Sequence, residues 1–512
     1  MPDAWRRRPL LGVAIFALIR LLISLPLIGG PAWQRDELMF MACGQHLSLG
    51  YVDDPPLVAW LCRLSYELFG YAAWGLRLWA SLSSAAVVFL TAKIAQKLGA
   101  SESGQLLSAA AVALAPAYAL SCINIGVFSY EPLWWCLLAL FLLEYQQNGH
   151  SRWLWLAGLA AGCGLLTKFT MGLWMLCLAA GILGTPQRRW FKQPALYGSV
   201  AVASAFLLPS LYWWSQHEWS GWLFLCSASQ GDSGVGLGGF WLGQIIYQHL
   251  LAAPVWIMGA LFLMRRRSPA RYLGWGALFY ALILSAVHTP IRYLSPLFPL
   301  LLAAGGAAWE SLAKPRIQAQ KALRACALSL SVLALGLTYV ALRPQAYNPA
   351  FYGRALSCGL YAPTPEASAD KVMENFYIQP KWRKRAEFIA DIYAQLPPEL
   401  RQSTLFYSED GALTAVLDML NGELDLPPTY CASYTPYYWE PRLQAPQVII
   451  SAHCRQRDRE VLRRYFPRVQ SAEARQLAPI FEDAPCFRVE INTSPKPCDI
   501  EQMRRELRHL ER

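Results

Sequence analysis

Four carboxylates lie close together in a short polar stretch near the N-terminus of a chain that otherwise has few charges. Asp36 and Glu37 come directly after an apolar run, and Asp53 and Asp54 come directly before two prolines. The letters between them, LMFMACGQHL, are amphipathic, so we expect this segment to lie along a membrane surface. A carboxylate at that depth has little water around it and becomes a stronger base. It can then take the proton from an attacking hydroxyl group.

A further carboxylate, Glu131, stands at the border of an apolar run in the stretch GVFSYEPLWW. Two interpretations remain open for it. A carboxylate beside an apolar run can take part in acid–base chemistry. It can also stabilise the first turn of a helix, where Pro132 fits and where the helix dipole favours a negative charge.

Three single cations, Arg77, Lys168 and Arg292, stand beside or within apolar runs. An unpaired charge is unfavourable at such a depth, so each cation needs a partner, and the phosphate of a lipid is one. The alternative is that the long side chains reach out to the membrane interface. Carboxylates for a nucleophile and cations for a phosphate together indicate the transfer of a group away from a lipid phosphate.

The composition indicates that membrane-spanning helices position these residues. Of the 512 residues, 55% are hydrophobic and 15% are charged, whereas about 25% are charged in average soluble proteins. We expect about eleven membrane-spanning helices, because the chain has that many apolar runs near the crossing length of about 20 residues. The two runs around Lys168 are short and are also compatible with a re-entrant hairpin. The runs are 10–28, 73–92, 105–122, 126–145, 153–167, 169–185, 194–214, 241–264, 272–288, 291–309 and 323–342.

Basic residues predict the orientation, because loops on the cytoplasmic side are rich in lysine and arginine. If the N-terminus is cytoplasmic, every loop on that side is basic. The external side then carries the loop 29–72 and the chain after residue 344. The net charge of +11 is explained in this way without a nucleic-acid partner. These cytoplasmic basic residues are Arg6, Arg7, Arg8, Lys93, Lys97, Arg152, Arg188, Arg189, Lys192, Arg265, Arg266, Arg267, Arg271, Lys314, Arg316, Lys321 and Arg324.

The composition turns polar at about residue 345, which divides the chain into a membrane domain, 1–344, and a soluble domain, 345–512. The letters TLFYSEDGALTAVLDML predict a strand, a loop and a helix, and QVIISAH and CFRVEIN predict further strands. We expect a small external α/β domain. Its cysteines face an oxidising compartment in this topology, so we expect at least one disulfide. They are Cys358, Cys431, Cys454, Cys486 and Cys498.

Six stretches in order resemble the motifs of bacterial family 39-like glycosyltransferases, relatives of the protein O-mannosyltransferases and of the aminoarabinose transferase that modifies lipid A. The similarity covers residues 1 to about 345 and is weaker in the tail, around YSEDGALTAV and YTPYYWEP. The resemblance implies the membrane glycosyltransferase fold called GT-C. It also implies an enzyme of the plasma (inner) membrane that takes a sugar from a polyprenyl-phosphate carrier. The stretches are RDELMFMACGQHLSLGYVDDPPLVAW, GLRLWASL, SYEPLWW, GLLTKFTMG, PSLYWWSQHEW and IRYLSPLFPL.

The resemblance also implies roles for single residues. Asp36 matches the acidic residue after the first span and is the candidate base, supported by Glu37. Glu131 stands where relatives have a second acid. Arg292 with Tyr293 matches the motif that holds the carrier phosphate.

One position departs from the relatives. Asp54 stands where the aminoarabinose transferases have lysine, and a carboxylate cannot bind phosphate. Another cation must therefore do so, with Lys168 and Arg77 as candidates, or the acceptor must differ. We assign Asp53 and Asp54 to the loop that meets the acceptor.

The expected reaction moves the sugar to a hydroxyl group on a lipid, a glycan or a protein, with inversion of the anomeric carbon. We expect no cofactor and no divalent metal, because cationic side chains already neutralise the phosphate. The alternative is a transporter or flippase of lipid-linked sugars, but transporters usually place ionisable residues near the membrane midplane and often contain inverted repeats. A third interpretation is a structural membrane subunit with a partner-binding tail, which leaves the carboxylates and cations unexplained.

Overall fold

The computed structural model describes most of the chain, which divides into two compact units. The first comprises residues 1–30, 54–212 and 229–372, and the second comprises residues 31–53, 213–228 and 373–512. The predicted domain border near residue 345 lies outside the described residues. The described residues are 10–26, 28–29, 35–70, 72–121, 125–228, 236–342, 378–432, 435–439, 445–452, 454, 456–474, 487–498 and 500–507.

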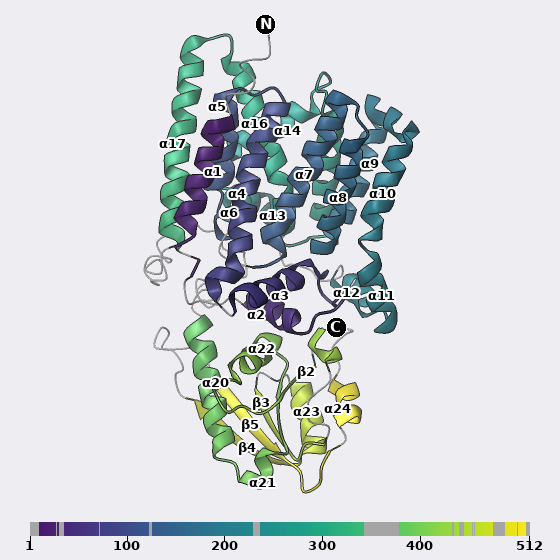
Figure 1. Cartoon of the computed structure of the whole chain (residues 1–512), viewed down its shortest axis with the longest axis vertical. Helices are drawn as coiled ribbons and strands as arrows, with labels where there is room; N and C mark the ends of the chain where they lie inside the picture. Colours follow the sequence, from purple (N-terminus) through teal and green to yellow (C-terminus); the bar gives the residue numbers. More distant parts are fainter. Residues whose placement is uncertain are drawn as a thin grey trace. The chain divides into compact units, whose positions relative to one another are not determined.

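The first unit is a bundle of helices, and its long helices run side by side (Figure 1). Helix α11 begins in this unit and continues into the second. The helices are α1 (Leu10–Ser24), α3 (Leu57–Phe69), α4 (Ala73–Lys97), α5 (Glu102–Leu114), α6 (Pro116–Ser121), α7 (Val127–Asn148), α8 (Arg152–Thr167), α9 (Thr170–Leu183), η2 (Pro186–Lys192), α10 (Pro194–Ala205), α11 (Leu208–Gln216), α13 (Leu237–Tyr247), η3 (Leu250–Ala252), α14 (Ala253–Met264), α15 (Arg271–Ala286), η4 (Ile291–Leu297), α16 (Phe298–Ala313) and α17 (Ile317–Leu342).

The bundle has the character of a polytopic membrane protein, but the predicted count of eleven crossing helices is not confirmed. Among the described residues, five helices are long and apolar enough to cross a membrane, or six if the pair α13 and α14, bent by 92°, counts as one. Each predicted run is helical, yet several are short or broken. The run 105–122 is split before Pro116, because proline lacks the N–H that would continue the helix.

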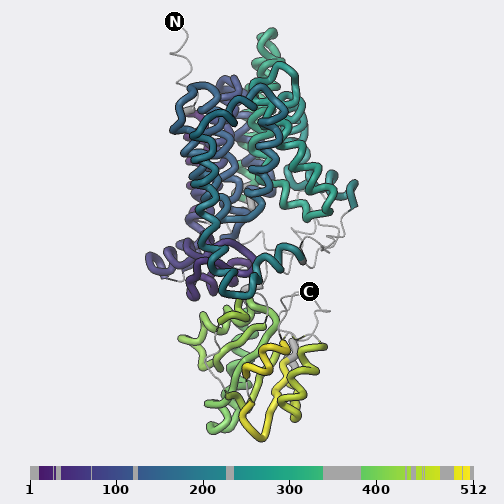
Figure 2. The backbone as a smooth tube through the Cα atoms, turned by 90° about the vertical axis from the view of Figure 1, so that its right-hand side faces the viewer, coloured from purple at the N-terminus to yellow at the C-terminus, as the bar shows by residue number. Residues whose placement is uncertain are grey.

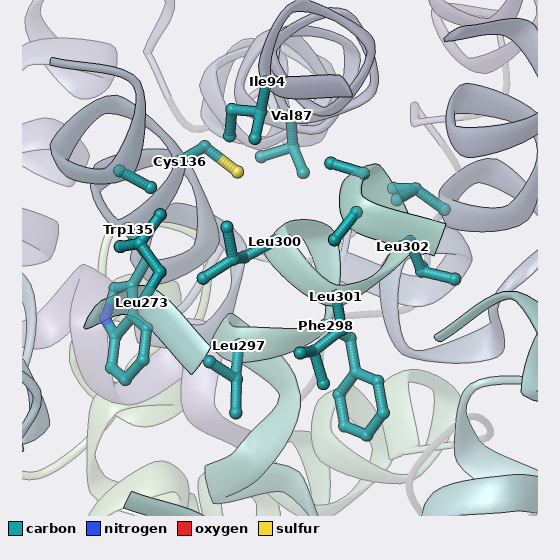
Figure 3. Packing of buried hydrophobic residues seen from close by; sticks show 14 of the residues in the cluster. Val87, Ile94, Trp135, Cys136, Leu273, Leu297, Phe298, Leu300, Leu301 and Leu302 are labelled. Carbon is teal, nitrogen blue, oxygen red and sulfur yellow. The ribbon is translucent and has the colours of Figure 1, made fainter. Parts of the chain in front are cut away.

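The core of the bundle is built from aliphatic and aromatic side chains that several helices contribute. Figure 3 shows Val87 of α4, Cys136 of α7 and Leu300 of α16 gathered within this core. Two helices approach closely through glycine. A Cβ atom added at Gly305 of α16 would overlap the carbonyl oxygen of Val255 of α14. Small residues at such crossings allow membrane helices to pack backbone against backbone.

The second unit contains a five-stranded sheet in the order β2-β1-β3-β5-β4. Strand β1 is parallel to β2 and β3, while β5 is antiparallel to β3 and β4. The predicted strands and helix of the C-terminal segment are all present. The elements are α2 (Arg35–Gln45), α12 (Ser220–Ala228), α20 (Ile378–Ala394), α21 (Pro398–Arg401), β1 (Thr404–Ser408), α22 (Gly411–Leu420), β2 (Thr429–Cys431), η6 (Thr435–Tyr438), β3 (Val448–Ala452), α23 (Gln456–Tyr465), β4 (Arg468–Ala474), β5 (Phe487–Thr493) and α24 (Ile500–Leu507).

Helices cover both faces of this sheet, because successive residues of a strand point to opposite faces. Phe406 packs with α20 and α22, whereas its neighbours Leu405 and Tyr407 pack with α23 and α24. In Figure 2 the green helices of residues 378–420 and the yellow-green helices near the C-terminus lie on opposite sides.

The apolar residues of the segment after α1 are buried by protein, and its position along a membrane surface stays a prediction. Residues 35–45 form helix α2, and its apolar side chains Leu38 and Ala42 are buried in the core of the second unit beside α20 and α22. Met39 lies against Gly411, the first residue of α22, where a Cβ atom would come within 2.8 Å of the Met39 sulfur. Leu38, Met39 and Ala42 of α2 thus pack against protein.

The predicted disulfide is not observed among the described cysteines. Cys431, Cys454 and Cys498 do not pair with one another. Cys358 and Cys486 lie outside the described residues.

The close crossing of α14 and α16 predicts a stability difference between two glycine substitutions. Gly305→Ala forces the helices apart, so we expect a lower unfolding temperature of the purified protein in detergent. Gly336→Ala, on α17, is the matched control, because a Cβ atom there has no neighbour within 4 Å, and alanine is favoured over glycine in helices by about 1 kcal/mol. A Gly305→Ala protein as stable as wild type would contradict the crossing.

Candidate functional site

Several helix ends of the first unit bring chemically active side chains together. Helix α8 ends at Thr167, Lys168 has extended backbone angles (φ −159°, ψ 139°), and α9 starts at Thr170. Helix η4 begins at Ile291, directly after Pro290, and Arg292 is its second residue. Because Lys168 lies between α8 and α9 and belongs to neither helix, its side chain can point toward α7 and η4.

The two cations meet the same pair of aromatic rings. The Lys168 Nζ lies 3.6 Å from the centre of the Phe128 ring and 4.2 Å from that of Tyr293. The Arg292 guanidinium carbon lies 5.4 Å and 5.9 Å from the same two ring centres. A cation over an aromatic face is stabilised by about 0.5 to 2 kcal/mol. Lys168 is buried and Arg292 is exposed, so the cluster extends from the interior to the surface of the unit.

Glu131 completes this cluster with a buried carboxyl group. Its side chain is 1% exposed, its Oε1 accepts a hydrogen bond from the Thr170 hydroxyl, and it interacts electrostatically with Lys168. The interpretation of Glu131 as a helix cap is wrong, because α7 begins at Val127 and has no acidic residue in its first turn.

The position of Tyr293 is fixed by a neighbouring helix, and Asp54 lies near its side chain. The Tyr280 hydroxyl donates a hydrogen bond of 3.1 Å to the Tyr293 carbonyl oxygen, which holds the first turn of η4 in place. Asp54 lies within electrostatic range of the Tyr293 side chain. Asp54 therefore belongs to the surroundings of the two cations.

Arg77 has a structural contact. It is 4% exposed, and its Nη1 donates a 3.1 Å hydrogen bond to the carbonyl oxygen of Ile28, after the end of α1. This bond compensates part of the buried charge and ties α4 to the end of the first helix. Its assignment to the carrier phosphate stays a prediction.

The remaining predicted site residues lie in the second unit. Asp36 and Glu37 form the first turn of α2; Asp36 is exposed, whereas Glu37 is fully buried. Asp53 accepts a 3.0 Å hydrogen bond from the Thr435 hydroxyl, which itself accepts a 2.9 Å bond from the Val52 amide. Thr435 thus fixes the end of the loop that holds Asp53.

Three members of the Lys168 cluster were not predicted: Phe128, Thr170 and Tyr280. Phe128 precedes Glu131 by three residues and Thr170 follows Lys168 by two, so both lie within stretches chosen for their charged residues. These residues could have been predicted from the sequence by looking for an aromatic ring or a hydroxyl group near a single charge in an apolar run.

The arrangement of the first unit suits an anionic ligand that carries a group to be transferred. Two cations can stabilise the negative charge of a phosphate, and the nearby carboxylate can stabilise positive charge or accept a proton. Among the described residues, no group of three or more His, Cys, Asp or Glu side chains is placed to hold a metal ion.

Part of the chain is similar in sequence to known glycosyltransferases. Residues 53–213 match the family model of dolichyl-phosphate-mannose-protein mannosyltransferases. The lipid A galacturonosyltransferase RgtD of Rhizobium johnstonii is 31% identical over 187 residues, which are 36% of this chain and 38% of that relative. An undecaprenyl phosphate-alpha-4-amino-4-deoxy-L-arabinose arabinosyl transferase of Pseudomonas aeruginosa is 28% identical over 203 residues, 36% of each chain. The aligned parts thus span little more than a third of these relatives.

The fold resembles two solved structures of one protein over nearly the whole chain. The crystal structure of ArnT from Cupriavidus metallidurans in the apo state matches with a TM-score of 0.62 at 16% identity, over 94% of this chain and 97% of that one. The same protein bound to undecaprenyl phosphate matches with a TM-score of 0.59, over 94% and 98% of the two chains. The sequence match and the fold together confirm the resemblance to the family 39-like membrane glycosyltransferases, the group that includes the aminoarabinose transferases.

Proposed function

We propose that this protein is a membrane glycosyltransferase that moves a sugar from a polyprenyl-phosphate carrier to an acceptor hydroxyl group. The observation that carries this proposal is the pair of cations, Lys168 and Arg292, held over two aromatic rings beside the buried Glu131. The names of the relatives support it, since they include a lipid A galacturonosyltransferase and an undecaprenyl-phosphate aminoarabinose transferase. A lipid A-type glycolipid is accordingly our first choice of acceptor, before a glycan or a protein.

The cations have the chemistry that the leaving group requires. When the acceptor oxygen bonds to the anomeric carbon, the bond from that carbon to the carrier phosphate breaks, and the phosphate gains negative charge. Lys168 and Arg292 stabilise that charge. In this proposal they also take the role of the lysine that relatives have at the position of Asp54.

The carboxylates serve the other half of the reaction. The acceptor hydroxyl loses its proton to a carboxylate as it attacks, and the sugar ring gains positive charge, which a nearby carboxylate stabilises. We propose Asp36 as the base, with Glu37 in support, and Glu131 as the group that stabilises the ring. A direct attack without a covalent sugar–enzyme intermediate inverts the anomeric configuration.

We propose that the helical unit spans the plasma membrane with its N-terminus in the cytoplasm and its C-terminal segment outside. The charged residues at the two ends of the helices differ in their partners. The Lys168 cluster gathers the start of α7, the end of α8 and the start of η4, whereas Lys97 and Glu144, at the ends of α4 and α7, form a 2.6 Å ion pair. We assign the cluster to the external side and the ion pair to the cytoplasmic side.

Transfer by the purified protein tests the proposal directly. We expect a polyprenyl-phosphate aminoarabinose or galacturonic acid donor to lose its sugar to lipid A, with a mass increase of the acceptor in mass spectrometry. Activity should survive treatment with EDTA, because cationic side chains neutralise the phosphate. Movement of intact sugar-lipid across proteoliposomes without transfer to any offered acceptor would instead establish a flippase.

Loss of the Lys168 charge should weaken carrier binding. A charge-assisted hydrogen bond contributes about 1.5 to 3 kcal/mol, so Lys168→Met should raise the Kd for undecaprenyl phosphate about 10- to 100-fold. Lys97→Met is the matched control, because Lys97 pairs with Glu144 at the other end of α7, and it should bind like wild type. Wild-type affinity in Lys168→Met would remove this lysine from the phosphate site.

Two amide substitutions separate the roles of the carboxylates. Asp36→Asn should lower the transfer rate on the order of 10² to 10⁴-fold, the range for loss of a general base, with carrier binding unchanged. Glu131→Gln removes the charge that competes with phosphate for Lys168, so carrier binding should not weaken, while the rate should fall about tenfold, which corresponds to about 1.4 kcal/mol.

Glu144→Gln is the control for these variants, because the same change lies on the same helix, about 20 Å from Glu131 along the helix axis. Its rate should match that of wild type. A larger loss in Glu131→Gln than in Asp36→Asn would assign the base to Glu131, and full activity in Asp36→Asn would remove Asp36 from the reaction.

A further inference from the structure

The second unit contains an open pocket that the proposed reaction does not use. It encloses about 440 Å³, the solvent at its mouth included. The pocket lies where α22 and the edge strand β2 meet the loop after η6 and the end of α2. Its lining is His46, Thr414, Asp418, Thr429, Tyr430, Cys431, Pro436 and Trp439.

One part of the lining is aromatic and apolar. The His46 ring stacks on Trp439 with ring centres 4.1 Å apart and planes inclined by 14°, and Pro436 lies beside them in the pocket wall. The stack joins two segments that are distant in the sequence, so this wall has a fixed shape. Such a wall favours a ligand with a flat face of C–H groups.

The polar part of the lining presents hydrogen-bond acceptors. The Thr429 hydroxyl donates its proton to Asp418 Oδ1 at 2.8 Å, and the Thr414 hydroxyl donates its proton to the Gly411 carbonyl oxygen at 2.9 Å. Both hydroxyl groups have thus given their proton to the protein and keep only lone pairs for a ligand. The Asp418 carboxylate is an acceptor as well. A ligand must therefore bring its own donors to the side of the pocket formed by Asp418, Thr414 and Thr429.

The lining excludes other classes of ligand. Among the described residues that form the pocket there is no lysine or arginine, and Asp418 repels anions, so phosphates and uronic acids are disfavoured. An acyl chain needs apolar walls on all sides. The wall around Asp418 does not provide them.

We propose that this pocket binds one sugar unit of the acceptor, a neutral or amino sugar whose hydroxyl or ammonium groups donate to Asp418, Thr414 and Thr429 and whose C–H face lies against the Trp439 wall. The assignment of the sugar to the acceptor rests on the proposed function. The pocket then selects the acceptor by its sugar, at residues separate from those assigned to the carrier phosphate.

Ligand-observed NMR with the full-length protein in nanodiscs tests the inference. The probes are D-glucosamine, D-glucose and D-glucuronate at about pH 7, where most of the glucosamine is protonated. We expect binding on the order of 1 mM for glucosamine, weaker binding for glucose and none for glucuronate. Asp418→Asn should weaken glucosamine binding about tenfold and glucose binding less, because only the amino sugar loses an ion pair of about 1.4 kcal/mol.

Matched variants separate loss of the pocket from loss of folding. Asp425→Asn, which changes an exposed carboxylate of the same unit, should bind like wild type. Trp439→Ala should lose both sugars, whereas Trp439→Phe keeps an aromatic wall and should retain them. Binding that is unchanged in Asp418→Asn and Trp439→Ala, or a preference for glucuronate, would overturn the assignment.

The transfer assay connects the pocket to the acceptor. Asp418→Asn should raise the KM for the acceptor and leave kcat and carrier binding unchanged. An unchanged KM would overturn the acceptor role. Sugar binding needs no donor, so the two proposals fail separately: Asp418-dependent binding in a protein without transferase activity refutes only the proposed function, and transfer without sugar binding refutes only the pocket.

Discussion

The ammonium group of Lys168 is the charge around which the candidate site is built. A lysine buried in an apolar bundle is costly unless other groups compensate its charge. The Phe128 ring and the Glu131 carboxyl group, both of α7, and the Tyr293 ring of η4 provide this compensation. In return, the lysine draws the starts of α7 and η4 toward the break between α8 and α9.

The rest of the bundle serves to hold these helix ends in register. Glycines at the crossing of α14 and α16 bring the backbones into contact, and η4 leads directly into α16, so the position of Arg292 depends on that packing. The Tyr280 hydroxyl fixes the same turn through the Tyr293 carbonyl. In the second unit, α22 packs against α2, and the Thr435 hydroxyl fixes the loop at Asp53 by a hydrogen bond.

The sequence predicted the charged members of the Lys168 cluster and Tyr293, and it missed Phe128, Thr170 and Tyr280 for a physical reason. A single charge in an apolar run has few tolerable environments, so Glu131, Lys168 and Arg292 stand out. Phe128 and Thr170 are ordinary residues in a membrane helix, and only their distance to a charge gives them a role. The strands of the C-terminal segment were predictable because their apolar runs are short and bounded by turns.

Other features depend on tertiary packing and could not be predicted from a local pattern. The amphipathic pattern of residues 35–45 correctly indicates a buried apolar face, but the pattern does not distinguish burial by lipid from burial by protein. Leu38 and Ala42 pack into the second unit because α20 and α22 offer an apolar surface there. A count of crossing helices meets a similar difficulty, since composition does not reveal the 92° bend between α13 and α14.

The most direct measurement of the central claim is a structure of the full-length protein in a lipid nanodisc with bound undecaprenyl phosphate. We expect the phosphate within hydrogen-bond distance of Lys168 Nζ and of the Arg292 guanidinium, with the Lys168 ammonium drawn off the Phe128 and Tyr293 rings toward the phosphate. A phosphate bound to other cations, with Lys168 still seated on the two rings, would contradict it.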